Sequence, residues 1–180
     1  MKPLLVTFIL SAVASLAFAA LPENLADGRY FIQSVKNSYY WDICTTEACP
    51  EASDNVFAHN TLFGDETQMF DVKVIPQNGF YTITSVGSGL AVTMKDTRNF
   101  VQSIYLSSPV SNDVYQHYEI VPSSSGASFE ILARASWKPS VRSPNKINGD
   151  IFLGKKDCII TRFRFIPVDS VQTITVQRQN

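Results

Sequence analysis

Residues 28–35 read GRYFIQSV, and a closely similar sequence, GFYTITSV, follows at residues 79–86. Gly, Tyr, Ile, Ser and Val recur in place, and a weaker third copy, GASFEI, begins at Gly126. Each copy closes with a similar triplet followed by a proline: Gln68-Met69-Phe70 with Pro76, Gln116-His117-Tyr118 with Pro122, and Thr161-Arg162-Phe163 with Pro167. Because internal similarity at a regular spacing is typical of repeat architectures, we interpret the chain as a threefold repeat.

Inside each repeat the apolar residues alternate with polar ones, as Phe70 and Val72 alternate with Asp71 and Lys73. Period-two alternation predicts strands with one buried face. We expect four short strands in each repeat, at 30–35, 40–44, 55–60 and 68–75, then 80–86, 90–94, 102–107 and 116–121, then 128–134, 139–143, 150–155 and 161–166. Turn residues separate these segments and no amphipathic segment of helix length interrupts them, so the sequence predicts an all-β domain.

These motifs resemble the ricin-B-type β-trefoil family. The sequence SVGSGLAV at residues 85–92 resembles the first hairpin of that family, and the Gln68 and Gln116 triplets resemble its Q-x-W repeats. The resemblance implies a β-trefoil with three four-stranded repeats and a C-terminal tail, at about 28–76, 77–122, 123–168 and 169–180. It implies less about function, because this fold is a scaffold for sugar binding, protease inhibition and receptor binding alike.

The ricin-type resemblance implies one shallow sugar pocket in each repeat. An Asp accepts hydrogen bonds from sugar hydroxyls, and an aromatic residue on the third strand stacks on the sugar. The Asp position falls, in repeat order, on Asp42, Ala91 and Ser140. The stacking position falls on His59, Ser107 and Gly154. We therefore expect at most one working pocket, in the first repeat, with these candidate carbohydrate-binding residues: Asp42, Trp41, His59 and Gln68.

Three of these candidates also have purely structural interpretations. Trp41 could supply the missing stacking surface together with Tyr39 and Tyr40, or one alternate of these three aromatic residues could pack in the core while Asp42 caps a turn. The amide of Gln68, like that of Gln116, could tie neighbouring turns instead of contacting a ligand. The sequence leaves both alternatives open.

A second resemblance is to small trefoil protease inhibitors of mushrooms, through G-x-Tyr-x-Ile, Tyr-Thr-Ile and the closing sequence FRFIP at 163–167. An inhibitor needs an exposed loop held in an extended form, so that docking costs little ordering entropy. One candidate loop spans residues 44–55, stiffened by Pro50 and by a Cys44–Cys49 bridge. The other, at 137–146, carries three cations that suit a trypsin-like pocket: Lys138, Arg142 and Lys146.

The first nineteen residues have the pattern of a secretory signal peptide, with Lys2, an apolar run at 4–16 and the cleavage sequence Ala17-Phe18-Ala19. We therefore expect the mature protein to be secreted. Cys44 and Cys49 are close enough in sequence to form a disulfide that leaves Cys158 unpaired, although a bridge from either of them to Cys158 is also open. No second Cys or His lies at zinc-ligand spacing, so no metal site is predicted.

The 180 residues include 15 Lys and Arg against 16 Asp and Glu. This balance predicts no excess of positive charge for binding nucleic acid. No apolar run after the leader is long enough to span a membrane. An enzyme is not expected, because the chain has only 2 His and no nucleophile or phosphate-binding motif, and the alternation assigns His117 to the outward face of its strand. We predict a secreted binding protein without a cofactor, whose partner is a glycan or an extracellular protein such as a protease or an effector target.

Overall fold

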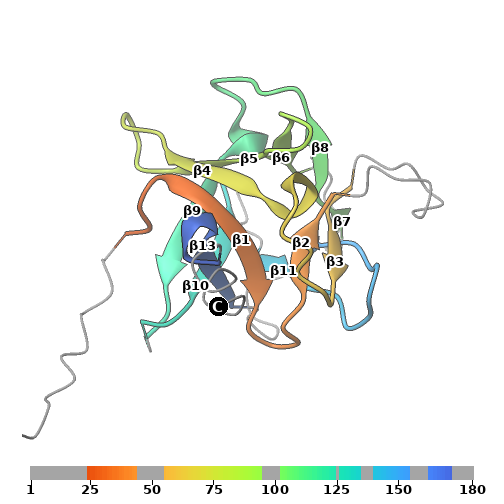
Figure 1. Ribbon diagram of the computed structural model, residues 1–180. Coiled ribbons are helices and arrows are strands. Elements are labelled where there is room, and N and C mark those ends of the chain that lie inside the picture. Colours follow the sequence, from red (N-terminus) through yellow and green to blue (C-terminus); the bar gives the residue numbers. More distant parts are fainter. Residues whose placement is uncertain are drawn as a thin grey trace, which may run out of the picture.

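The computed structural model describes residues 24–43, 55–94, 102–124, 126–134, 140–154 and 162–171, whose arrangement is shown in Figure 1. The predicted signal peptide, the C-terminal residues 172–180, Lys138 and all three cysteines lie outside these ranges, so the predictions that concern them stay predictions. Within the described part of the chain, no helix combines the length and apolarity needed to cross a membrane.

Every segment predicted to form a strand contains one, and the segment at 102–107 contains two. The first repeat holds β1 (Gly28–Ser34), β2 (Tyr40–Asp42), β3 (Phe57–His59) and β4 (Phe70–Val74). The second holds β5 (Tyr81–Ser85), β6 (Ala91–Thr93), β7 (Gln102–Ser103), β8 (Tyr105–Ser107) and β9 (Tyr118–Pro122). The third holds β10 (Phe129–Ala133), β11 (Ser140–Arg142), β12 (Phe152–Gly154) and β13 (Phe163–Pro167).

The first and last strands of the three repeats form a closed barrel. Following the pairing, β1 leads to β4, β5, β9, β10 and β13, and β13 pairs with β1 again. Six of the remaining strands form three hairpins, β2–β3, β6–β8 and β11–β12, and the short strand β7 pairs with β12. Bridges from Asn55 to Tyr105 and from Phe57 to Asp150 join the first hairpin to the other two. Closure of the barrel leaves no free edge, and the hairpins cover one end of it.

Trp41 lies in the core, where its ring contacts residues of the barrel strands β4 and β13. Its side chain is 0% exposed, as are those of Val92 and Val141 at the corresponding places of the other hairpins. The indole ring packs edge-on against Phe70 and Phe163, with both ring centroids 5.7 Å away. The prediction that Trp41 stacks on a sugar is therefore wrong, because its ring has no face open to solvent.

The alternation predicted that the closing glutamines begin strands, at 68–75 and 116–121, and this prediction is wrong. Each ends a short 3-10 helix: η1 (Glu66–Gln68) and η2 (Val114–Gln116). The carboxylates of Asp65 and Asp113 cap these helices, and each accepts a hydrogen bond from the backbone N–H two residues later, at 3.1 and 2.9 Å. An Asp three residues before each Gln is a helix-start signal that the sequence does contain.

His117 is buried, and its predicted outward position is wrong. The residue follows η2 directly, so the alternation of the strand begins only at Tyr118. Nη1 of Arg134 lies 3.0 Å from Nδ1 of His117, and the Arg134 guanidinium lies 4.5 Å from the centre of the Phe80 ring. Burial, followed by the nearby Arg134 cation, lowers the pKa of His117. The imidazole is therefore held in its neutral form as part of the packing.

Candidate functional site

The Gln68 side chain organises one surface of the first repeat. It is fully buried, and its Oε1 accepts a hydrogen bond of 2.6 Å from the backbone N–H of Phe63. Its Nε2 donates to Oδ2 of Asp42 at 3.0 Å and to the carbonyl oxygen of Thr61 at 2.9 Å. A buried amide whose donors and acceptor are all engaged has one orientation. Gln68 therefore fixes the loop at 61–63 and the Asp42 carboxylate together.

Gln116 does the same for the second repeat. Its Oε1 accepts from the backbone N–H of Val110 at 2.8 Å, and its Nε2 donates to Ser107 Oγ and to the Ser108 carbonyl oxygen at 3.0 and 2.9 Å. Both amides thus tie turns, which is the structural interpretation left open by the sequence. They differ in one partner, because Gln68 also holds a carboxylate where Gln116 holds a hydroxyl.

Asp42 lies at the end of β2 and is half-buried. Burial is the main influence on this carboxyl and raises its pKa, while hydrogen bonds from Thr67 and Gln68 act in the opposite direction. A carboxylate fixed in this way can accept paired hydroxyl donors in charge-assisted hydrogen bonds. No three His, Cys, Asp or Glu side chains gather as metal ligands around it or elsewhere among the residues that the structure describes.

His59 and Phe63 form an aromatic pair on the same hairpin surface. His59 lies opposite Tyr40, two residues from Asp42 along β2, and its ring centroid is 4.7 Å from that of Phe63. Nδ1 of His59 lies 3.1 Å from the backbone nitrogen of Thr61 and 3.3 Å from its carbonyl oxygen, so both contacts hold the imidazole against the start of the loop. Phe63 is 59% exposed, although the loop that carries it is fixed by Gln68.

Phe63 was missed by sequence reasoning, which assigned stacking to the third strand. Comparison of the repeats in the structure identifies it, since Phe63 and Val110 are the residues whose backbone N–H groups donate to the two closing glutamines. Both side chains are exposed, at 59% and 55%. The loop before each closing glutamine therefore presents one apolar side chain to solvent, and only in the first repeat of this pair is it aromatic.

The strand register corrects the predicted equivalents of Asp42. Tyr40, Ala91 and Ser140 share one position, because they lie opposite His59, Ser107 and Gly154, the residues at the predicted stacking position. Two residues further along these strands, the position of Asp42 is occupied by Thr93 in the second repeat and by Arg142 in the third. The Ala91 and Ser140 assignments are therefore wrong by two residues.

The corrected equivalents give the three hairpins different chemistry. Thr93 is buried and its Oγ1 lies 2.8 Å from Oγ of Ser107, so the second repeat carries two hydroxyls in place of a carboxylate and an imidazole. The third repeat carries the cation Arg142 beside Gly154. Of the three equivalent positions, the first alone combines a carboxylate with a neighbouring aromatic ring.

Two of the candidate inhibitory residues, Arg142 and Lys146, lie in the described part of the chain, and they do not share an extended loop. Arg142 lies within β11, paired with Phe152 and half-buried, so its prediction as a loop residue is wrong. Lys146 is exposed but lies in a turn, where its carbonyl oxygen accepts from the Gly149 N–H at 3.4 Å and Asn148 has a φ of 56°. A turn of this kind does not present Lys146 in the extended form that an inhibitor requires.

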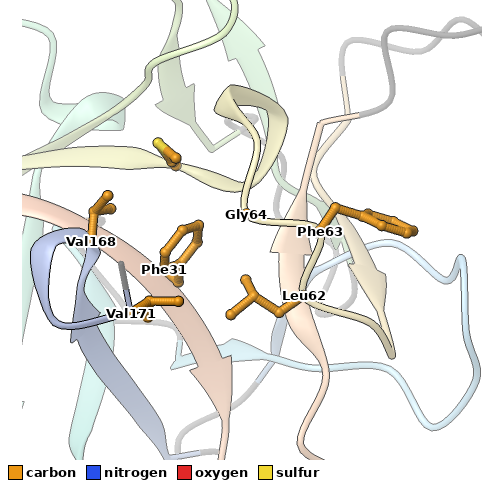
Figure 2. A pocket seen from close by; sticks show the side chains of 7 residues that line it. Phe31, Leu62, Phe63, Gly64, Val168 and Val171 are labelled. Carbon is orange, nitrogen blue, oxygen red and sulfur yellow. The ribbon is translucent and has the colours of Figure 1, made fainter. Parts of the chain in front are cut away.

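An apolar hollow lies on the other side of the loop that carries Phe63. It has a volume of about 250 Å³ and is lined by Phe31, Leu62, Phe63, Gly64, Met69, Val168 and Val171. In Figure 2, Leu62 and Phe31 point into this space, Val168 and Val171 bound it, and the Phe63 ring extends in the opposite direction. The loop at 62–64 is thus a ridge between the hollow and the Asp42 surface.

No protein-family model matches the sequence, and no curated protein matches it either. Solved structures do match. ThreeFoil, a designed threefold-symmetric protein, superimposes with a TM-score of 0.65 at 16% identity, over 78% of this chain and 99% of its own. The fold is a β-trefoil. The comparison confirms the architecture implied by the ricin-B-type resemblance.

Two further solved structures match with slightly lower TM-scores. The Rhizoctonia solani agglutinin has a TM-score of 0.62 at 19% identity, and the match covers 81% of this chain and 99% of the agglutinin. SeviL, solved with the asialo-GM1 saccharide bound, has a TM-score of 0.62 at 10% identity, with coverages of 79% and 98%. At these identities the likeness establishes the fold and leaves function to the residues of the site.

Proposed function

We propose that the protein is a secreted, lectin-like carbohydrate-binding protein that acts by binding and not by catalysis, through one pocket in the first repeat. The observation that carries this proposal is the 3.0 Å hydrogen bond from Gln68 to Asp42 beside the exposed ring of Phe63. It supplies an oriented carboxylate for sugar hydroxyls and, next to it, an apolar face for the sugar ring.

Each residue of the pocket has a distinct role in this proposal. Asp42 accepts hydrogen bonds from two sugar hydroxyls. Phe63 is the stacking surface, supported from behind by His59. Gln68 is a positioning residue, because it is buried and acts through Asp42 and the Phe63 backbone.

Two further observations support the proposal from outside the pocket. The leader pattern at 1–19 favours export to a space where glycans are exposed. Among the similar folds, one is named an agglutinin and another was solved with a saccharide bound.

The Asp42→Ala variant is expected to bind glycans about tenfold to a hundredfold more weakly, since it loses charge-assisted hydrogen bonds of about 1.5–3 kcal/mol. The thermal midpoint is expected to fall by only a few degrees, because Gln68 keeps its bonds to Thr61 and Phe63. A glycan array identifies the ligand, and calorimetry with that ligand measures the loss. Thr93→Ala, at the equivalent position of the second repeat, is the control and should leave glycan binding unchanged. A large fall in midpoint with unaltered glycan binding would refute this role for Asp42.

Glycan affinity is expected to fall on acidification, with a midpoint above the ordinary Asp pKa of 3.8, because burial raises the pKa of Asp42 and the carboxylate must be ionised to accept. Stability changes in the opposite sense. A pKa raised by folding means that the contribution of Asp42 to stability is fully present below the unfolded pKa and is lost as pH rises through the folded one. Titrating affinity and thermal midpoint together, with Asp42→Asn as the control that lacks both dependences, tests this. An affinity that is constant down to the ordinary Asp range would contradict it.

A further inference from the structure

The apolar hollow and the Asp42 surface share one structural element, the loop at 62–64. Leu62 points into the hollow, whereas the ring of Phe63 lies on the other side against His59 (Figure 2). Gln68 holds this loop through the Phe63 N–H at 2.6 Å and through the Thr61 carbonyl oxygen at 2.9 Å. The two surfaces are therefore adjacent and fixed relative to each other.

The lining of the hollow suits an uncharged, flexible apolar group. None of its seven lining residues carries a charge, and Met69 adds an adaptable thioether side chain. A volume of about 250 Å³ is many times the space that one water molecule needs, so the hollow has room for a chain of several carbons. Its apolar side chains can contact an alkyl chain of that length.

The charges next to the hollow argue against a free fatty acid as its ligand. Asp65 follows Gly64 directly and Asp169 follows Val168, and both acidic residues are exposed. A ligand carboxylate close to these two residues would meet charges of its own sign. A neutral head group carries no such penalty, and a sugar is a neutral head group that the adjacent Asp42 pocket can accept.

We propose that the ligand of the first-repeat pocket is a glycoside with an apolar aglycone, whose sugar contacts Asp42 and Phe63 and whose alkyl chain crosses the ridge into the hollow. This inference rests on the proposed carbohydrate-binding function. It adds a ligand class, the glycolipid-like amphiphile, and assigns a binding role to Leu62, Met69 and Val171.

The test compares methyl and octyl β-galactoside, and methyl and octyl β-glucoside, by calorimetry below the concentrations at which the octyl compounds form micelles. Burial of each methylene is worth about a fourfold gain in affinity, so the octyl compound of the recognised sugar should bind at least about thirtyfold more tightly than the methyl compound. Val171→Phe fills the hollow and should reduce this ratio to about threefold or less while leaving the methyl glycoside unaffected. Met69→Phe is a second filling variant, and Val114→Phe, an exposed position on η2, is the control.

The outcomes separate the two proposals. If methyl glycosides bind in an Asp42-dependent way but the octyl compounds gain nothing, the aglycone site is refuted while the carbohydrate-binding function stands. An octyl advantage that persists in both filling variants also refutes the aglycone site. The same holds for an octyl advantage that is measured only after removal of residues 172–180, since those residues would then be the group that fills the hollow. If neither glycoside of either sugar binds and the glycan array is blank, the proposed function fails and the inference fails with it.

Discussion

Replacing Trp41 with alanine is expected to lower the free energy of unfolding by about 3–5 kcal/mol, the cost typical of truncating a buried aromatic side chain. The indole is 0% exposed and packs edge-on against Phe70 of the first repeat and Phe163 of the third. Its removal leaves a cavity beside Phe70 and Phe163, because each of these rings loses its edge-on contact with the indole. At about 2–4 °C per kcal/mol for a domain of this size, the thermal midpoint should fall by about 10 °C.

Thermal unfolding of the variant beside Val92→Ala measures this effect. Val92 occupies the equivalent place of the second hairpin and is equally buried, but it loses far fewer atoms on truncation, so its midpoint should fall less. Glycan binding by the folded Trp41→Ala protein should be retained at low temperature. Loss of glycan binding with an unchanged midpoint would instead place Trp41 among the sugar-contacting residues.

The repeats and their turn residues were sufficient to locate the strands, but not to decide which face of a three-residue strand is buried. In β2, Trp41 points to one face and Tyr40 and Asp42 to the other. With aromatic residues on both faces, alternation permits either choice. The buried face is determined by the partner strand, where Trp41 lies opposite the fully buried Ala58.

The equivalents of Asp42 were misassigned for a related reason. A shift of two residues keeps every side chain on the same face of a strand, so the alternation of apolar and polar residues cannot distinguish the two alignments. Ala91 and Thr93 share one face of β6, as Ser140 and Arg142 share one face of β11. Only the pairing partners, Ser107 and Gly154, distinguish the two positions.

The carboxylate of the candidate site was predictable and its aromatic partner was not. Asp42 and His59 lie on paired strands, so a repeat alignment finds them. Phe63 lies in a loop without regular structure, and its position depends on a hydrogen bond from its backbone N–H to the buried side chain of Gln68. A side chain-to-backbone contact of this kind leaves no periodic pattern in the sequence.

The Gln68→Leu variant is expected to lose about 3 kcal/mol of stability and all measurable glycan binding. The substitution leaves the Phe63 N–H and the Thr61 carbonyl oxygen without their buried hydrogen-bond partner. Each group left unpaired costs about 1–3 kcal/mol of folding free energy. It also releases the Asp42 carboxylate and the loop that carries the stacking ring. Thermal unfolding gives the first effect, and calorimetry with the array-identified glycan gives the second.

Gln116→Leu is the matched control, because Gln116 is 2% exposed and holds its own loop through Val110 and Ser108 in the same way. It should destabilise the fold to a similar extent and leave glycan affinity unchanged, since the pocket of the first repeat is not touched.

The Gln68→Glu variant tests the two donor hydrogen bonds of Gln68 separately from its acceptor. It keeps the acceptor for Phe63 but turns the two donors into a carboxylate oxygen that faces Asp42 and the Thr61 carbonyl oxygen, so it should destabilise more than Gln68→Leu does. Equal loss of glycan binding in Gln68→Leu and Gln116→Leu would mean that stability alone governs binding, and that Gln68 does not position the pocket.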